Sequence, residues 1–348
     1  MKLALLPVLA LVACGDDGGS GEMCDRTTVR DGKMCARLSD YGLFDDIATQ
    51  TPTEGVIPYD LNTPLFSDYT TKQRFFAVPD GEAMTWADPD AFAVPTGTIV
   101  IKTFSYLADR RAPAGDRRLL ETRLLVKQDS GWTGASYIYG DATDDAALAV
   151  AGDTLAASWI HDDGAERTND YVVPNKNQCK NCHADHDDTI DLLGPKARHI
   201  NRDGQLEDLV ARGVLAGAPD PAMWPRAPDA FDAQAGTLDE RARAWLDINC
   251  AHCHNPRGAA RTSGLYLDLA QTDPVDFGVC KPPVAAGRGS GGRLFGIVPG
   301  KPDESILMFR LESTEADVKM PELGRNLVDA EGVALMREWI AAMPGACP

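Results

Sequence analysis

Two pentapeptides of the form C-x-x-C-H constrain this chain more than any other feature of its 348 residues. They occupy residues 179–183 and 250–254. Two cysteines three residues apart on one helical turn can form thioethers with the two vinyl groups of a haem, while the following histidine reaches the iron. The chain has only 9 Cys and 6 His, so two chance occurrences are not expected. The sequence therefore predicts two covalently attached haem c groups.

Each residue type in the motif has its own role. The cysteines attach the porphyrin and the histidine is the proximal iron ligand, so the expected site residues are Cys179, Cys182, His183, Cys250, Cys253 and His254. A zinc site built from the two cysteine pairs is the alternative, but Cys179 and Cys250 are 71 residues apart, beyond the usual zinc-ribbon spacing. A thioredoxin-like dithiol would need only one such motif.

The N-terminus predicts export from the cytoplasm. Met1 and Lys2 precede an apolar run over residues 3–13, which is too short to span a bilayer. The run ends in Leu11-Val12-Ala13-Cys14-Gly15, which resembles the bacterial lipobox. We therefore expect a signal peptide over residues 1–13, a lipid on Cys14, and a lipid anchor and tether over residues 14–35. An ordinary secretory signal is the alternative.

The residue after the lipid-bearing cysteine bears on localisation. By resemblance to known lipoproteins, an Asp directly after the cysteine would favour retention at the inner membrane, and this chain has Gly15 there. We therefore expect a lipoprotein of the bacterial outer membrane, facing the periplasm or the exterior.

Four cysteines remain after the haem motifs and Cys14 are assigned, an even number that predicts two disulfides in an oxidising compartment. They are Cys24, Cys35, Cys280 and Cys347. Four cysteines allow three pairings. Proximity in the sequence favours Cys24 with Cys35, and Cys280 with Cys347.

The charge balance bears on the partners. The chain has 52 Asp and Glu against 34 Lys and Arg, a formal net charge of −18. This excess argues against nucleic acid or a bare anionic membrane surface as a partner and favours a basic or neutral redox protein. Simple solubility is the alternative explanation of the charge.

The region 36–173 has the pattern of a β-rich domain. Short apolar or alternating runs are separated by clusters of Pro, Gly and Asp, and the strands expected from them lie near residues 73–78, 97–107, 118–127 and 135–139. These runs predict an antiparallel sandwich or barrel-like module, whose role the sequence does not reveal.

After residue 173 the pattern becomes helical. We expect a first haem c domain over residues 174–236 and a second over 237–348, where Thr237 and Glu240 form a capping-box pattern. A terminal helix is expected over 329–343. The predicted fold class is α+β multidomain, with an N-terminal antiparallel β-rich module followed by two α-helical cytochrome c-like haem domains.

Each haem iron is expected to need a distal ligand. Met320 precedes a proline in non-helical chain and is the candidate for the haem of His254. For the haem of His183, Met223 and His199 are nearly equal candidates. The other possibilities are His186, His161, water or an open site.

Several longer segments carry a family resemblance. They are Gly42-Leu43-Phe44, Pro58-Tyr59-Asp60-Leu61-Asn62-Thr63-Pro64-Leu65-Phe66-Ser67-Asp68 and residues 192–198, 246–256 and 319–324. With the two motifs, they resemble a family of bacterial dihaem c-type cytochrome lipoproteins with a β-rich N-terminal region. The resemblance implies electron transfer in the envelope, the six attachment and proximal residues, and Met320 as a distal ligand. It implies no defined substrate, and the family usually has an amide residue at the position of His199.

The function expected from these features is that of a lipid-anchored dihaem c-type cytochrome that relays electrons in the bacterial cell envelope. Such a relay needs no catalytic residue and no substrate turnover. The alternative is a dihaem oxidoreductase, peroxidase-like or acting on a small substrate, with an open first haem. A binding lipoprotein without redox function is a more distant third.

Overall fold

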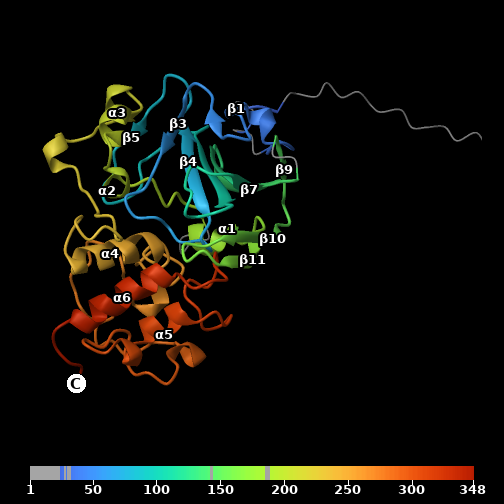
Figure 1. Cartoon of the computed structure of the whole chain (residues 1–348). Coiled ribbons are helices and arrows are strands. Elements are labelled where there is room, and N and C mark those ends of the chain that lie inside the picture. The colour runs from blue at the N-terminus through green and yellow to red at the C-terminus, as the bar shows by residue number, and fades with distance from the viewer. Residues whose placement is uncertain (1–23, 27–28, 30–32, 142–143, 185–188) are drawn as a thin grey trace, which may run out of the picture.

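An antiparallel sheet of six strands lies at the centre of the N-terminal half (Figure 1). The computed structural model describes residues 24–26, 29, 33–141, 144–184 and 189–348. In spatial order the strands are β3 (Val56–Tyr59), β4 (Thr71–Ala77), β6 (Ile99–Leu107), β7 (Arg117–Gln128), β8 (Gly131–Tyr139) and β9 (Ala146–Leu148).

The four strands expected from the sequence are confirmed as β4, β6, β7 and β8. Their β-branched, aromatic and leucine-rich runs pair in one continuous antiparallel ladder. The sheet is open, with β3 and β9 at its edges, so of the two expected forms, a sandwich or a barrel-like module, the barrel-like one is not formed.

The two faces of this sheet differ in chemistry because successive side chains of a strand point to opposite faces. Ile101 and Leu124 belong to a core that also contains Leu43 and Tyr41 of the preceding segment. The opposite face carries charged side chains that line a cavity. The sheet therefore buries one face and presents the other to the rest of the chain.

A separate β-hairpin covers part of the sheet face that carries the charged side chains. Its strands β10 (Asp153–Ile160) and β11 (Glu166–Val173) pair along their whole length. Trp159 of the hairpin stacks on Tyr106 of β6, with ring centroids 4.5 Å apart. Figure 1 shows that the chain runs from β11 into α1 (Cys179–His183).

The remaining elements are short. The α-helices of the described residues are α1 (Cys179–His183), α2 (Ala197–Ile200), α3 (Gln205–Ala211), α4 (Leu238–Asn249), α5 (Ile306–Glu312) and α6 (Ala330–Ala342). The small strands are β1 (Phe44–Asp46), β2 (Thr51–Pro52), β5 (Met84–Thr85) and β12 (Leu215–Ala216). No helix among the described residues is long and apolar enough to cross a membrane.

Two helices agree with the sequence. The capping box is present at the start of α4, where Thr237 and Glu240 bond to each other's backbone N–H groups. The terminal helix α6 buries Met336 and Ile340 of its apolar stripe. Figure 1 shows α4, α5 and α6 gathered on one side of the sheet, and Trp245 of α4 shares a core with residues of α5 and α6.

The two expected α-helical cytochrome c-like domains are wrong, because the structure is mostly β and only 21% helical. The segment after the first motif does not form a helical core of its own. Instead, Ile200 and Leu206 pack against Phe76 and Phe92 of the β region, and β12 pairs with β5. Short helices bury too little apolar surface to form a separate core, so this segment shares that of the sheet.

Candidate functional site

The two C-x-x-C-H motifs meet in space although they are far apart in the sequence. The Sγ atom of Cys253 lies 4.0 Å from the backbone O atom of Asn181. The potential ligand atoms of Cys182, His252 and Cys253 all lie within 4.8 Å of one another. The first motif forms α1, and the second begins where α4 ends.

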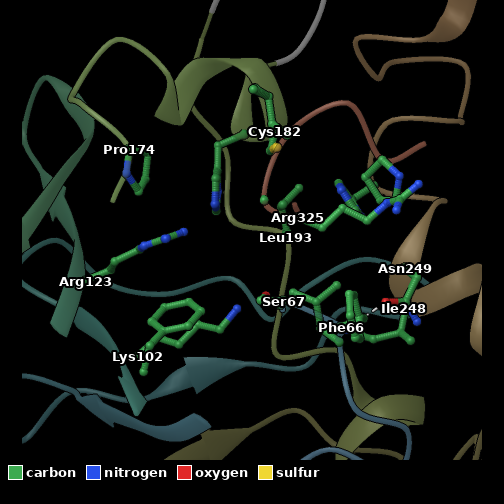
Figure 2. Close-up of a pocket in the computed structure, with 18 of the residues that line it drawn as sticks. Phe66, Ser67, Lys102, Arg123, Pro174, Cys182, Leu193, Ile248, Asn249 and Arg325 are labelled. Carbon is green, nitrogen blue, oxygen red and sulfur yellow. Dashed lines mark hydrogen bonds between the residues drawn. The ribbon is translucent and has the colours of Figure 1, made fainter. Parts of the chain in front are cut away.

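The end of α4 fixes the position of the second motif. Asn249, its last residue, accepts a hydrogen bond of 2.9 Å from the backbone N–H of Phe66 (Figure 2). The Nδ2 atom of Asn249 donates to the backbone O atom of Trp245 at 3.0 Å. The indole N–H of Trp245 donates in turn to Asp329 at the start of α6. These bonds tie the start of the second motif to the 66–67 segment and to the terminal helix.

Two cavities adjoin the motifs. The first cavity has a volume of about 410 Å³ and is lined by Cys179, Cys182, His183 and His252, among others. The second cavity has a volume of about 950 Å³ and shares Cys182, His183 and His252 with the first. Both volumes fall within the range of about 300–1,000 Å³ typical of cofactor and small-molecule sites.

His183 presents one ring nitrogen for coordination. Its Nδ1 atom lies 3.1 Å from the backbone O atom of Asp191. A carbonyl oxygen only accepts, so Nδ1 carries the proton and Nε2 has a free lone pair. Burial lowers the pKa of His183, which favours the neutral imidazole that binds metals.

His254 has the same arrangement with a different partner. Its Nδ1 atom lies 3.3 Å from the Oγ atom of Ser263. The hydroxyl of Ser263 donates its single proton to the backbone O atom of Ala260, so Oγ accepts from Nδ1–H. Burial, with the charges of His252 and Arg310, lowers the pKa of His254 to about 4. Both motif histidines are therefore neutral, with Nε2 available.

Among the described cysteines, the four of the two motifs are free thiols. Burial raises the pKa of Cys250 to about 12. The hydrogen bond between Cys182 and Cys253, with His252 nearby, lowers the pKa of Cys182 and raises that of Cys253.

The other described cysteines form two disulfides, Cys24 with Cys35 and Cys280 with Cys347. These are the pairings favoured from the sequence. The lipobox, Cys14 and His186 lie outside the described residues.

Met320, the expected distal ligand, lies in a loop held by many hydrogen bonds. Its backbone N–H donates to Arg310 at 3.0 Å, and the guanidinium of the buried Arg325 donates to its carbonyl at 2.8 Å. Met320 lines the first cavity, as His183 does, whereas His254 is not part of that lining. Its assignment to the haem of His254 stays a prediction.

The two candidates for the other distal ligand occupy very different places. Met223 is 72% exposed on a short 3-10 helix, Pro221–Met223, and lines neither cavity. His199 is buried, and its Nε2 atom lies 2.6 Å from Oδ2 of Asp247, which Arg198 also binds. Although burial raises the pKa of Asp247, the bonds and charges of His199 and Arg198 outweigh it and lower that pKa.

Two features of the site were missed from the sequence. His252 lies between the two cysteines of the second motif, and its ring lies within 4.8 Å of the Sγ atom of Cys182 in the first motif. The sequence alone gives no sign of this contact. Three cations of the sheet, Arg74, Lys102 and Arg123, line the first cavity. They lie on separate strands, so only the strand pairing brings them together.

The chain matches no protein-family model, and searches of curated proteins and of solved structures also found no match. What the site does is therefore inferred from its own residues and geometry.

Proposed function

We propose that this protein relays electrons in the bacterial cell envelope through two covalently bound haem c groups, one at each motif. The observation that carries this proposal is that His183 and His254 have the same hydrogen-bonding arrangement. In each imidazole Nδ1 is engaged by a backbone or hydroxyl oxygen and Nε2 is free. Hydrogen bonding at the second ring nitrogen is how proteins orient a histidine that coordinates a metal.

The residues present fit a haem at each motif. Cys179 and Cys182 are free thiols at the edge of the first cavity. Cys250 and Cys253 are the free thiols of the second motif, and the Sγ atom of Cys253 lies within 4.8 Å of that of Cys182. The other described cysteines are oxidised, so the motif thiols are spared in a chain that otherwise forms disulfides. A bound haem c supplies reversible one-electron chemistry at its iron.

The chain supplies the surroundings for such a relay. Phe66, Leu193 and Ile248 line the first cavity with apolar surface, as Figure 2 shows. Apolar walls exclude water and influence the reduction potential of a buried metal. The contact between Asn181 and Cys253 brings the two attachment segments together, which suits transfer within one molecule.

The proposal includes the cell envelope as the compartment. The disulfides Cys24–Cys35 and Cys280–Cys347 fit an oxidising environment. We infer a lipid on Cys14 and attachment to the outer membrane, with a basic or neutral redox protein as the partner of a chain that carries a net charge of −18. Fatty-acid labelling of the wild type and of a Cys14→Ser variant tests the anchor. Labelling of both or of neither contradicts it.

One observation favours a second candidate, a dihaem oxidoreductase with an open first haem. His199 is occupied by Asp247, and Met223 is 72% exposed, so neither is placed to bind an iron at His183. An iron without a protein ligand on its distal side can take a small molecule instead.

Carbon monoxide separates these candidates. The visible spectrum of the purified, reduced protein is recorded before and after the gas is added, on a sample whose haem, iron and zinc contents are known. A relay with two six-coordinate irons shows no change. A shift in one of the two haems supports the oxidoreductase. Zinc without haem, at the cluster of Cys182, His252 and Cys253, overturns both.

A further inference from the structure

Three cations form a row across the central sheet. Arg74 of β4 is directly opposite Lys102 of β6, and Lys102 is directly opposite Arg123 of β7. We call these three residues the cationic row. Directly opposite residues of an antiparallel pair have Cβ atoms about 4.5–5.5 Å apart, and like charges in this position destabilise a sheet. The row therefore costs stability unless an anion compensates it.

The protein compensates the row only in part. Arg74 is 7% exposed, and its Nη2 atom has no hydrogen-bond partner among the described residues. Its nearest carboxylate in an ion pair is that of Asp60, at 3.6 Å, and this side chain is 68% exposed. Arg123 contacts the buried Glu121 at 2.5 Å, but its Nε atom is also without a partner there.

Lys102 is the central member of the row. Its Nζ atom lies over the ring of Phe104, 4.9 Å from the centroid. Burial, followed by the charges of Arg74, Lys72 and Arg123, lowers the pKa of Lys102 well below its ordinary value. The surroundings of this ammonium group are thus short of negative charge.

The carboxylates that line the first cavity have partners outside the row: Glu322 pairs with Arg310, and Asp329 accepts from Trp245 and Gly332. Asp68 accepts hydrogen bonds from the backbone N–H groups of Asn326 and Leu327, at 2.7 and 2.8 Å. Asp247 is held by Arg198 and His199. They are therefore committed to other groups and do not neutralise the row.

The row faces the first motif across the first cavity. All three cations line this cavity together with Cys179 and Cys182. Figure 2 shows Lys102 and Arg123 extending from the sheet into the space that Cys182 also faces.

An apolar row runs beside the cationic one, two residues before Lys102 on β6 and two residues after Arg123 on β7. Val100 is opposite Leu125, and Leu125 is opposite Gly134. A Cβ atom built on Gly134 would lie 3.4 Å from the Sγ atom of Cys179, so the thiol lies against this row. The wall of the cavity is thus apolar beside the thiol and cationic next to it, which suits a ligand with an apolar body and carboxylate groups.

We propose that the cationic row binds the propionate carboxylates of the haem attached through Cys179 and Cys182. This inference rests on the proposed function, and it gives the β-rich region the task of holding that haem. A free dicarboxylate entering the cavity would present the same chemistry.

The first test uses the loaded protein with two haems. Arg74→Gln and Lys102→Met each remove one charge of the row, and Arg117→Gln, an exposed position on the same sheet, is the matched control. Arg123 is left unchanged because its loss would strand the buried Glu121. We expect both row variants to lower the reduction potential of one haem, since a nearby positive charge favours the less positive reduced iron. Unchanged potentials in both variants overturn the proposal.

The second test compares the loaded protein with a protein that lacks only the first haem. In a Cys179→Ser/Cys182→Ser background, Lys102→Met removes uncompensated repulsion and is expected to raise Tm. In the loaded protein the same change removes a partner of the carboxylates and is expected to lower Tm. If Lys102→Met raises the Tm of both proteins, or lowers the Tm of both, the assignment is contradicted. If the background does not fold, the potentials of the first test decide the matter.

Succinate distinguishes the two sources of carboxylate. Any molecule that binds the folded state raises Tm with its concentration. We expect succinate to raise the Tm of the background that lacks the first haem and not that of the loaded protein, with the response lost in Lys102→Met. A response of the loaded protein assigns the row to a free anion and overturns the propionate assignment.

If haem counting shows no haem at the first motif, the proposed function itself fails. A response to succinate then identifies the row as a free-anion site.

Discussion

The Nε2 atom of His199 lies 2.6 Å from Oδ2 of Asp247, and this bond joins the segment after the first motif to the helix that leads into the second. Arg198 binds the same carboxylate at 2.7 and 3.0 Å. One buried carboxylate therefore links the segment after the first motif to the helix that precedes the second.

Asp247→Asn is expected to destabilise the protein by about 3–5 kcal/mol, because it leaves a buried arginine without its charged partner. Urea unfolding measures this change. The control is Asp208→Asn, which breaks an exposed pair with Arg212 and should cost less than about 1 kcal/mol. Equal effects of the two substitutions would contradict a special role for Asp247.

The group formed by Arg198, His199 and Asp247 also predicts that the folding stability falls as the medium becomes acidic. Burial lowers the pKa of His199 from 6.5, so below about that pH the unfolded chain binds a proton that the folded chain does not. The folded state loses up to about 1.4 kcal/mol per pH unit from this group. We expect unfolding free energies measured across pH 7 to 5 to fall less steeply in His199→Asn than in the wild type. Equal slopes would show that His199 does not titrate in this way.

Asp247 adds a further loss of folding stability at lower pH. Its pKa lies below 3.8 in the folded state, so its contribution is present above that value and is lost as the pH falls further.

Met320→Ala is expected to open one iron. The reduced variant should bind carbon monoxide at one haem, and the reduction potential of that haem should fall because a methionine ligand raises it. Met223→Ala, at an exposed position, should change neither property. If Met320→Ala leaves the spectrum insensitive to carbon monoxide, Met320 is not a ligand. Repeating the measurement in proteins with one intact motif identifies which haem is affected.

Ser263→Ala tests the hydrogen bond on His254. Loss of the acceptor makes the imidazole less basic as a ligand, so we expect the reduction potential of one haem to rise. Ser290→Ala, at the end of the short 3-10 helix Gly287–Ser290, is the matched control. An unchanged potential in Ser263→Ala would indicate that the serine does not support an iron ligand.

Local features such as strands and a helix cap could be predicted from the sequence. The packing of distant segments into a common core could not. Strands β4, β6, β7 and β8 and the capping box at Thr237 follow from residue type and spacing over a few positions. The prediction of an independent first haem domain was wrong because the apolar residues Ile200 and Leu206 fit a helical core as well as a core shared with the sheet. Only the tertiary structure shows that they pack on Phe76 of the sheet.

The site shows the same division. The motif cysteines and histidines are recognisable from five consecutive residues. The cationic row depends on the register of three strands, and no spacing along the chain indicates that Arg74, Lys102 and Arg123 are neighbours. Likewise, the engagement of His199 by Asp247 depends on a contact across 48 residues.

Counting covalent haem tests the central claim most directly. The protein is produced in a host that matures c-type cytochromes, and haem per chain is measured for the wild type, Cys179→Ser/Cys182→Ser and Cys250→Ser/Cys253→Ser. We predict two haems in the wild type and one in each variant, with the remaining haem resistant to acid extraction. A wild-type protein without covalent haem, or a haem content unaffected by both double substitutions, would contradict the account.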